Sequence, residues 1–496
     1  MTAVSTNSVA QLPSTAQLAI TNLKNAGLSE VLHLQGTEIY EERLKSYWAL
    51  TPRLRAWALV LPRTTEEVSL AVKALVGTPD CQFAIRSGGH MCSPGASGIE
   101  NGIGIDLGLL AKITYDAETK LASVQPAPRW LDVYKTLEKD GVMVAGGREG
   151  LVGVGGLLLG GGLSNHTCRV GLACDQVVNY EVVLADGSIV NANETTNEDL
   201  FRALKGGGNN FGIVTRFDIQ TFPACDVWDG MLYHPKTETP AVIDALVNLV
   251  DHLKTTDEPS EHYLGVWRYI PEARDISLFS ILTQLDGAES TEPLKEFLSI
   301  PRHQGNMQKW SIAAKTTAFT VQSNQHSIWL STCFKNDRRI ARKAISTYEE
   351  LIDHIKEKHI PSGEFEAMHV LQALPTSSTR LSPILKGNML GLERLAGEAV
   401  ILTVTWIHVP TWELAQAIFP KYKALLDELD AYAESLGGSV EFRYANYCDR
   451  SQNPLATYGQ ENIRKMREAS KKYDPTGVFQ TRVPGGFKIS KVKTTE

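Results

Sequence analysis

Two stretches rich in glycine constrain the fold of this chain more than any other feature of its sequence. The short turn Ser87–His90 follows a strand-like segment, and a longer run extends from Gly153 to Gly162. Because glycine has no Cβ atom, both stretches allow the backbone to pass close to a ligand or to another strand. The backbone amides of such a turn also form a concave site that binds phosphate groups. Taken singly, each stretch fits tight strand packing equally well, since neither is a strict nucleotide-binding motif.

The size and charge of the chain narrow the classes of protein to which it can belong. With 496 residues it is long enough for about two or three domains with substantial cores. Hydrophobic residues make up 43% of the chain and charged residues 21%, and the net charge is -7. An acidic chain of this kind offers no basic surface for nucleic acid or for an anionic membrane. We therefore expect no nucleic-acid partner.

Neither a secretory signal nor a membrane span is expected from the sequence. The segment Met1–Leu23 has no basic start followed by a continuous apolar core, and no later run approaches membrane-spanning length. The seven cysteines are odd in number and form no CxxC pair, which favours reduced thiols over a disulfide framework. We expect a cytoplasmic protein with no membrane partner and no metal site. The sequence leaves the oligomeric state open.

Strand and helix patterns change near Pro223. Up to Phe222, short apolar strands alternate with turns, and Glu181–Val190 predicts a hairpin with a type I′ turn at its Asp-Gly pair. Beyond Pro223, apolar stripes at helical spacing run through Ile340–Ile355 and Ile418–Leu436, and they predict helices packed on a sheet. The strand-like segments between and around these helices are Tyr263–Ile270, Ile276–Leu285, Ser327–Phe334 and Val400–Val409.

The two glycine-rich stretches belong to a series of six segments that follow one another along nearly the whole chain. They are Arg86–His90, Gly153–Gly162, Cys174–Gly187, Gly206–Thr215, Tyr444–Tyr447 and Tyr473–Phe479. This combination resembles the berberine-bridge-enzyme-like FAD-linked oxidases of the vanillyl-alcohol-oxidase superfamily, and their fungal members in particular. The resemblance implies an α+β fold, with a PCMH-type FAD-binding domain and a second α+β substrate domain in which helices cover an antiparallel sheet. It places an N-terminal lobe and the FAD-binding domain at 1–223, the substrate domain at 224–437 and a return to the FAD domain at 438–496.

The resemblance also assigns residues to the cofactor. His90 stands where the family attaches the C8 methyl group of FAD, and Glu149 stands where many relatives carry a cysteine that forms a second link. A carboxylate does not replace a thiolate in that bond, so we expect a single covalent link, through His90. Val152 stands where a small side chain accompanies oxidases, which favours O2 as the electron acceptor. The residues expected to contact FAD are Arg86, Ser87, Gly88, Gly89, His90, Val152, Gly153, Gly155, Gly156, Gly162, Asp175, Gly212, Ile213, Val214, Asn446 and Tyr447.

Two side chains are candidates for moving a proton. Alternation along a strand through residues 440–446 would place Tyr444 on the same face as Asn446, which the motif puts at the carbonyl edge of the flavin. A tyrosine that acts as a general base needs a lowered pKa or a relay, because its ordinary pKa is about 10. His166 stands just beyond the glycine run, where fungal relatives carry aromatics, so it is a candidate acid, base or substrate anchor. A structural role for His166 and a core role for Tyr444 stay open as alternatives.

Six aromatic side chains in the substrate half are candidates for lining a pocket. Each of them is more often part of a core than of a binding site. They are Trp267, His326, Trp329, His369, Trp406 and His408, and the last two share a strand face.

The resemblance implies an FAD-dependent oxidoreductase that acts on a small organic substrate. We expect an oxidase that removes a hydride while O2 is reduced to H2O2, in a pathway of secondary metabolism. Two alternatives stay open: a redox-neutral cyclase in which FAD is structural, and a non-catalytic flavin-storage or scaffold protein. The sequence does not identify the substrate.

Overall fold

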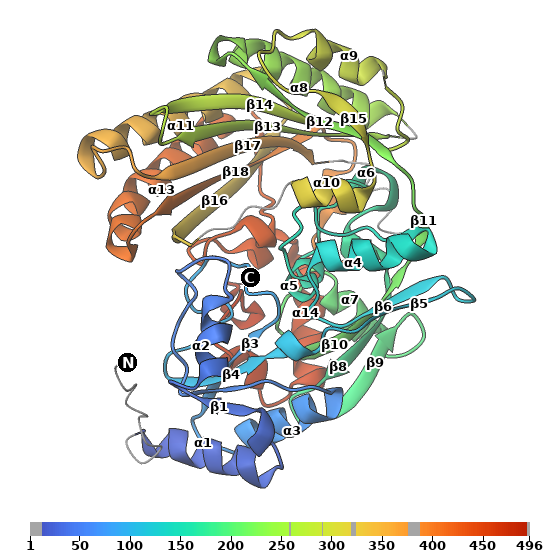
Figure 1. Cartoon of the computed structure of the whole chain (residues 1–496), viewed down its shortest axis with the longest axis vertical. Helices are drawn as coiled ribbons and strands as arrows, with labels where there is room; N and C mark the ends of the chain where they lie inside the picture. The colour runs from blue at the N-terminus through green and yellow to red at the C-terminus, as the bar shows by residue number, and fades with distance from the viewer. Residues whose placement is uncertain (1–11, 257–258, 290, 319–323, 375–386, 494–496) are drawn as a thin grey trace.

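A computed structural model describes residues 12–256, 259–289, 291–318, 324–374 and 387–493 of the chain. Residues 1–11 of the N-terminal segment, for which no secretory signal is expected, lie outside these ranges. Most elements up to β10 lie in the lower half of Figure 1, with α6 (Thr167–Val170) reaching up beside α10 (Ile312–Ala318), and an eight-stranded sheet with its helices occupies the upper half. No helix in the described ranges is both long and apolar enough to cross a membrane.

Two sheets form the lower half of the molecule. The first has the order β1 (Leu32–Leu34), β2 (Ala58–Val60), β4 (Gly102–Asp106) and β3 (Gln82–Arg86), with β4 parallel to both neighbours. The second is antiparallel, with the order β5 (Ile113–Asp116), β6 (Leu121–Val124), β10 (Ile213–Gln220), β8 (Val177–Val183) and β9 (Ile189–Asn193). A short ladder pairs β7 (Val142–Met143) with β11 (Phe222–Pro223). Helices α1 (Ser14–Asn25) and α3 (Thr65–Val76) share a core with the first sheet.

Shorter helices surround the two lower sheets. They are α2 (Glu38–Lys45), α4 (Trp130–Leu137), α5 (Val154–Leu159), α6 (Thr167–Val170) and α7 (Glu198–Leu204). The chain returns to this half with α14 (Gln460–Tyr473), which packs against α7, and α15 (Val478–Thr481). The phenol of Tyr473 donates to the Asp199 carboxylate at 2.5 Å, which fixes α14 to α7.

The upper half is one antiparallel sheet of eight strands. Its order is β15 (Met307–Trp310), β12 (Val227–His234), β14 (Asp275–Gln284), β13 (Glu261–Ile270), β17 (Glu366–Leu374), β18 (Val400–Val409), β16 (His326–Lys335) and β19 (Ser439–Val440). Its helices are α8 (Thr239–Thr255), α9 (Glu292–Ser299), α10 (Ile312–Ala318), α11 (Arg338–Lys358) and α13 (Trp412–Ser435). The α+β fold with an antiparallel sheet covered by helices is therefore confirmed.

The predicted apolar stripes explain why the helices cover one face of this sheet. Ile340 and Leu351 of α11, and Ile418 and Leu425 of α13, are all buried in one core with the sheet. Trp267 of β13 is fully buried in the same core. Each fully buried aliphatic side chain contributes roughly 1.5–3 kcal/mol to folding. The opposite face of the sheet is turned towards the lower half.

Two local predictions are wrong. In the hairpin β8–β9, Gly187 N donates to Leu184 O, and only Gly187, not Asp186, has a positive φ, of 76°. A type I′ turn requires a positive φ at both central residues, so this turn is of another type. Leu184 N also donates to Ser188 O, which leaves three residues in the loop, one more than the predicted Asp-Gly pair. The strand expected through 440–446 ends at Val440, and Ala445–Tyr447 form a 3-10 turn instead.

Candidate active site

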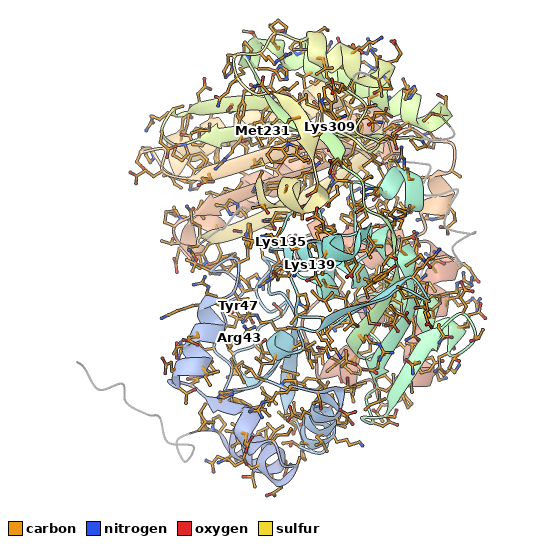
Figure 2. The ribbon with its side chains drawn as sticks, turned by 45° about the vertical axis from the view of Figure 1, so that its right-hand side comes forward. Arg43, Tyr47, Lys135, Lys139, Met231 and Lys309 are labelled. Atoms are coloured by element: carbon orange, nitrogen blue, oxygen red, sulfur yellow. The ribbon has the colours of Figure 1, made fainter. Side chains whose placement is uncertain are left out.

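A cavity of about 1240 Å³ lies where the lower half meets the open face of the eight-stranded sheet. Its lower wall contains the two glycine-rich stretches, and its upper wall contains side chains from β12, β13, β14, β16, β17 and β18. Met231 of β12, labelled in Figure 2, belongs to this upper wall. Trp329 and Trp406 stack on each other there, with ring centroids 5.2 Å apart. A large, mostly apolar cavity between two lobes is the usual setting of a cofactor site.

The two glycine-rich stretches cross each other at the floor of the cavity. A Cβ atom built on Gly88 would lie 2.6 Å from the Cα of Gly153, and the reverse holds for Gly153. A Cβ on Gly155 would lie 2.9 Å from the Ser87 hydroxyl oxygen, so that position also requires glycine. A Cβ on Gly156, in contrast, would meet no atom within 4 Å, and this glycine leaves open space on the cavity wall. The arrangement provides a backbone-lined cradle for a large ligand.

Arg86 supports the glycine turn from below and does not line the cavity. Its guanidinium donates to Asp106 at 3.2 Å and lies over the Tyr47 ring, 3.7 Å from the centroid. Arg43 donates to the same carboxylate at 2.8 Å, and both Arg43 and Tyr47 are labelled in Figure 2. Burial lowers the pKa of Arg86, and the Asp106 charge opposes this shift. Arg86 therefore holds the turn that ends at His90.

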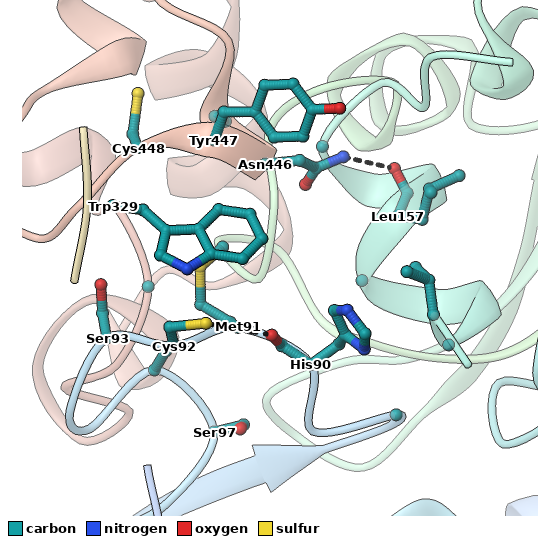
Figure 3. Close-up of a pocket in the computed structure, with 18 of the residues that line it drawn as sticks. His90, Met91, Cys92, Ser93, Ser97, Leu157, Trp329, Asn446, Tyr447 and Cys448 are labelled. Atoms are coloured by element: carbon teal, nitrogen blue, oxygen red, sulfur yellow. Dashed lines mark hydrogen bonds between the residues drawn. The ribbon is translucent and has the colours of Figure 1, made fainter. Parts of the chain in front are cut away.

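His90 projects into the cavity at the end of the glycine turn (Figure 3). Its Nδ1 is buried and has no hydrogen-bond partner, and its Nε2 lies 3.9 Å from the Glu149 carboxylate. The indole of Trp48 stacks on the imidazole. Burial, followed by the charge of Arg129, lowers the pKa of His90 to about 3. The imidazole is therefore neutral near pH 7, with a nitrogen available for a bond to a ligand.

Most of the other residues expected to contact FAD also line the cavity. They are Ser87, Gly89, Val152, Gly212, Ile213, Val214, Asn446 and Tyr447, besides the glycines already described. Gly162 and Asp175 do not line it. Gly162 has a φ of 84° and packs against Ala173, and the Asp175 carboxylate accepts from Leu172 N and from Asn388, both at 2.9 Å. These two residues shape the loop behind the cavity wall.

Tyr444 and Asn446 point the same way although they do not lie on a strand. The Asn446 amide donates to Tyr444 Oη at 3.0 Å and to the Leu157 carbonyl at 3.1 Å, the latter bond drawn in Figure 3. Tyr444 Oη also accepts from Leu163 N at 2.8 Å. Burial raises the pKa of Tyr444, which is opposite to the direction that a general base needs. Near neutral pH this phenol keeps its proton.

His166 lies behind the cavity wall. Its ring packs on Phe222 with centroids 5.2 Å apart, and burial is the main cause that lowers its pKa to about 4. Its neighbour Asn165 lines the cavity, but the His166 side chain does not. Tyr444 therefore lines the cavity, whereas the His166 side chain lies behind the cavity wall.

Of the six aromatic candidates in the substrate half, the two indoles Trp329 and Trp406 line the cavity. Trp267 is buried in the core between sheet and helices. The imidazole of His369 lies between the hydroxyls of Thr405, at 2.7 Å, and Thr403, at 3.0 Å. The remaining two, His326 and His408, are not among the cavity-lining residues either.

Comparison with known proteins gives this cavity its chemical context. Residues 56–193 match the model of the FAD binding domain family. Over 96% of its length the chain is 35% identical to the FAD-dependent monooxygenase drtC of Aspergillus calidoustus, of which it covers 91%. The chain belongs to the same family as this relative, a family of fungal FAD-dependent oxidoreductases with an FAD binding domain.

Solved structures show the same fold in distant oxidases. A xylooligosaccharide oxidase from Myceliophthora thermophila aligns with a TM-score of 0.76 and 21% identity, over 97% of this chain and all of that one. A glucooligosaccharide oxidase from Acremonium strictum, described with a 6-S-cysteinyl, 8α-N1-histidyl FAD, aligns with a TM-score of 0.74 and 18% identity. That alignment covers 96% of this chain and 99% of the oxidase.

Several cavity residues of this FAD-dependent oxidoreductase were not expected from the sequence, and three of them stand out chemically: Trp48, Arg148 and Lys488. Trp48 and Arg148 line the cavity beside His90 and Tyr447. Lys488, near the C-terminus, also lines it and donates to the Asn209 amide oxygen at 3.0 Å. Burial lowers the pKa of Lys488 to about 7. These residues reach the cavity from segments far apart in the sequence. The only sequence feature that could have indicated one of them is the position of Arg148 among glycines.

Proposed function

We propose that this enzyme is an oxidase that holds FAD through a single covalent bond to His90. The observation that carries the proposal is the neutral His90 imidazole, whose buried Nδ1 has no partner and which ends the glycine turn inside the cavity. Held by His90 and the two glycine-rich stretches, FAD would supply the redox chemistry of an oxidase, in which a small organic substrate loses a hydride and a proton and O2 is reduced to H2O2. We place the reaction in secondary metabolism.

The surroundings of His90 support one covalent link and no second one. The Glu149 carboxylate lies 3.9 Å from Nε2 of the imidazole, and a carboxylate cannot form the thioether that a cysteine would form with the flavin. Two thiols do line the cavity, but burial raises the pKa of Cys92 well above its ordinary value and that of Cys448 to about 12. A protonated thiol is a poor nucleophile. All seven cysteines lie in the described residues and form no disulfide, which supports our proposal of a cytoplasmic enzyme.

Tyr444 is the residue that moves a proton in this proposal. Tyr444 accepts hydrogen bonds from Leu163 N and Asn446, so its own proton is the one that it can pass on. We keep Tyr444 as the residue that moves a proton, as a donor or relay because its pKa is raised by burial. His166 does not line the cavity, so this proposal does not assign the proton transfer to it.

Oxygen access is the second part of the proposal. Val152 lines the cavity and is only half buried, and in this proposal its small side chain lets O2 reach the flavin. A second candidate function is that of a monooxygenase, which transfers one oxygen atom of O2 to the substrate. It is favoured by the relative of 35% identity, which carries that name. Both candidates use O2. An oxidase converts both oxygen atoms into H2O2, whereas a monooxygenase places one in the product and one in water.

An anaerobic mixing experiment distinguishes the candidates. The compounds to test are metabolites that accumulate in cells from which the gene for this chain has been deleted. Loss of the visible flavin absorbance on anaerobic mixing, followed in air by one H2O2 for each product, supports an oxidase. Product that carries an atom from labelled O2, with water in place of H2O2, identifies a monooxygenase. Product formed without any loss of absorbance overturns both and identifies the redox-neutral cyclase.

A further inference from the structure

Arg148 reaches across the cavity from the loop that follows β7. The two preceding residues are glycines packed on the Trp130 ring, where an added Cβ atom would lie 2.2–2.4 Å from ring carbons. This tight packing fixes the direction in which the loop leaves. The Arg148 guanidinium then meets three neutral acceptors, each at 2.7 Å: His262 Nε2 of β13, Gln372 Oε1 of β17 and the Tyr447 hydroxyl. We name these four residues the Arg148 cluster.

The guanidinium of Arg148 has no anionic partner in the described part of the chain, where no carboxylate oxygen lies within ion-pair distance of it. The two other cations on the upper wall of the cavity are neutralised. Lys315 is paired with the buried Asp229 carboxylate, and Arg268 donates to Glu366 at 3.0 Å. An unpaired cation in a largely apolar cavity is unfavourable unless a ligand supplies the opposite charge. This charge balance sets Arg148 apart from Lys315 and Arg268.

The partners of Arg148 also have unused donors. A guanidinium has no lone pair, so His262 Nε2 must accept its hydrogen bond, and the proton of this imidazole is therefore on Nδ1. Both His262 Nδ1 and Gln372 Nε2 are buried and have no partner. Burial, followed by the charge of Arg148, lowers the pKa of His262 well below its ordinary value, so the imidazole stays neutral. The cluster thus combines one positive charge with two idle N–H donors.

The strands place these donors on the face that forms the cavity. Gln372 is opposite Leu264 in the β13–β17 register, and His262 stands two residues from Leu264 on the same side of β13. Leu264 and His262 line the cavity, whereas Gln372 lies directly behind its wall and is 1% exposed. Buried donors that lack partners are rare in folded proteins, and such groups beside a cavity that holds an unpaired cation point to a ligand that accepts from them.

We propose that the Arg148 cluster binds the carboxylate of an organic-acid substrate. A carboxylate offers two acceptor oxygens and one negative charge, which match the idle donors and the unpaired guanidinium. This proposal deepens the proposed function and rests on it, because it names the chemical class of substrate for the same cavity. Binding of the acid group would fix the reacting C–H bond relative to the cavity floor.

Benzoate is the probe, and benzamide is its uncharged counterpart of the same shape. Each is titrated into the flavin-containing enzyme while the visible absorbance of the flavin is recorded. We expect benzoate to perturb the spectrum and benzamide to bind at least ~10-fold more weakly, since a hydrogen bond to a charged group contributes more than a neutral one. In Arg148→Gln, benzoate binding should weaken by ~10–100-fold and benzamide binding should stay the same.

Arg268→Gln is the matched control, because Arg268 lines the same cavity on the same face of β13 but is already paired with Glu366. It should leave benzoate binding unchanged. Arg148→Lys keeps the charge and should retain part of the binding, which covers the case in which Arg148→Gln does not fold. Flavin content and melting temperature of each variant are measured first.

Equal binding of benzoate and benzamide to the unaltered enzyme would overturn the proposal, and that comparison requires no variant. It would also be overturned if Arg148→Gln shifted the flavin reduction potential but left benzoate binding intact, because Arg148 would then serve the cofactor. The titration involves no turnover. An enzyme that failed the anaerobic mixing test would therefore still report on carboxylate binding, and the two proposals fail independently.

Discussion

The indole of Trp48 lies flat against the imidazole of His90, with ring centroids 4.6 Å apart and an angle of 26° between the planes. The stack limits rotation of the His90 ring and keeps water from one of its faces. Trp48→Ala should therefore reduce the share of flavin that stays with the chain after acid denaturation, because stacking of this kind contributes about 0.5–1.5 kcal/mol. Trp48→Phe retains an aromatic ring and should retain most of the covalent flavin. An unchanged share in Trp48→Ala would show that the stack has no part in flavin attachment.

The hydrogen bonds of Tyr444 predict two separate effects of Tyr444→Phe. The rate of flavin reduction should fall by roughly 10²–10⁴-fold if the phenol moves a proton. The free energy of unfolding should fall by about 1–3 kcal/mol for each donor, Leu163 N or Asn446 Nδ2, that is left without an acceptor. Stopped-flow absorbance measures the first effect and thermal unfolding the second. Should His166→Phe slow reduction while Tyr444→Phe does not, proton transfer belongs to His166 instead.

Val152→Leu tests the path of oxygen. The larger side chain would fill part of the space that Val152 leaves at the cavity wall, so reoxidation by O2 should slow while flavin reduction by substrate stays nearly the same. Mixing the substrate-reduced enzyme with air-saturated buffer measures the oxidative half-reaction alone. A variant that slowed both half-reactions equally would indicate disturbed packing rather than a blocked path.

The buried imidazole of His369 predicts a loss of stability in acid. Burial lowers its pKa to about 3 in the folded chain, against about 6.5 when unfolded. The unfolded chain therefore binds more protons between these values, and stability falls as the pH drops below about 6.5. At pH 5 this group alone costs about 2 kcal/mol. Melting curves of His369→Gln should show a shallower decline from pH 6.5 to 4.5, and an unchanged slope would contradict the assignment.

The strand and helix patterns of the substrate half could be predicted because burial there follows a simple period. Val400–Val409 is a largely apolar run that is buried on both faces, and the predicted bounds coincide with those of β18. The stripes of α11 and α13 also correspond to buried residues, since each helix packs one face on the sheet. Phe442 and Tyr444 alternate as a strand would, yet the chain leaves the sheet after Val440. Apolar alternation alone does not distinguish a strand from an extended segment packed in a core.

Residues of the cavity wall could be named from the sequence where they belong to a local motif, and not where the fold brings distant residues together. His90 and most residues of the two glycine stretches line it, because their chemistry depends on adjacent residues. Arg86 and Asp175 belong to the same motifs, but their side chains turn away to bind other parts of the chain. Arg148 acquires its role only through contacts with residues at least 114 positions away, and no local pattern could reveal them.

Mass analysis of flavin-bearing peptides tests the central claim most directly. The purified enzyme is denatured and digested, and every peptide that carries the mass of FAD is sequenced. The account predicts one such peptide, containing His90, and flavin that becomes fully extractable in His90→Ala. Flavin that separates from the unaltered chain on denaturation, or fragment masses that place the flavin on Cys92 or Cys448 in place of His90, would contradict it.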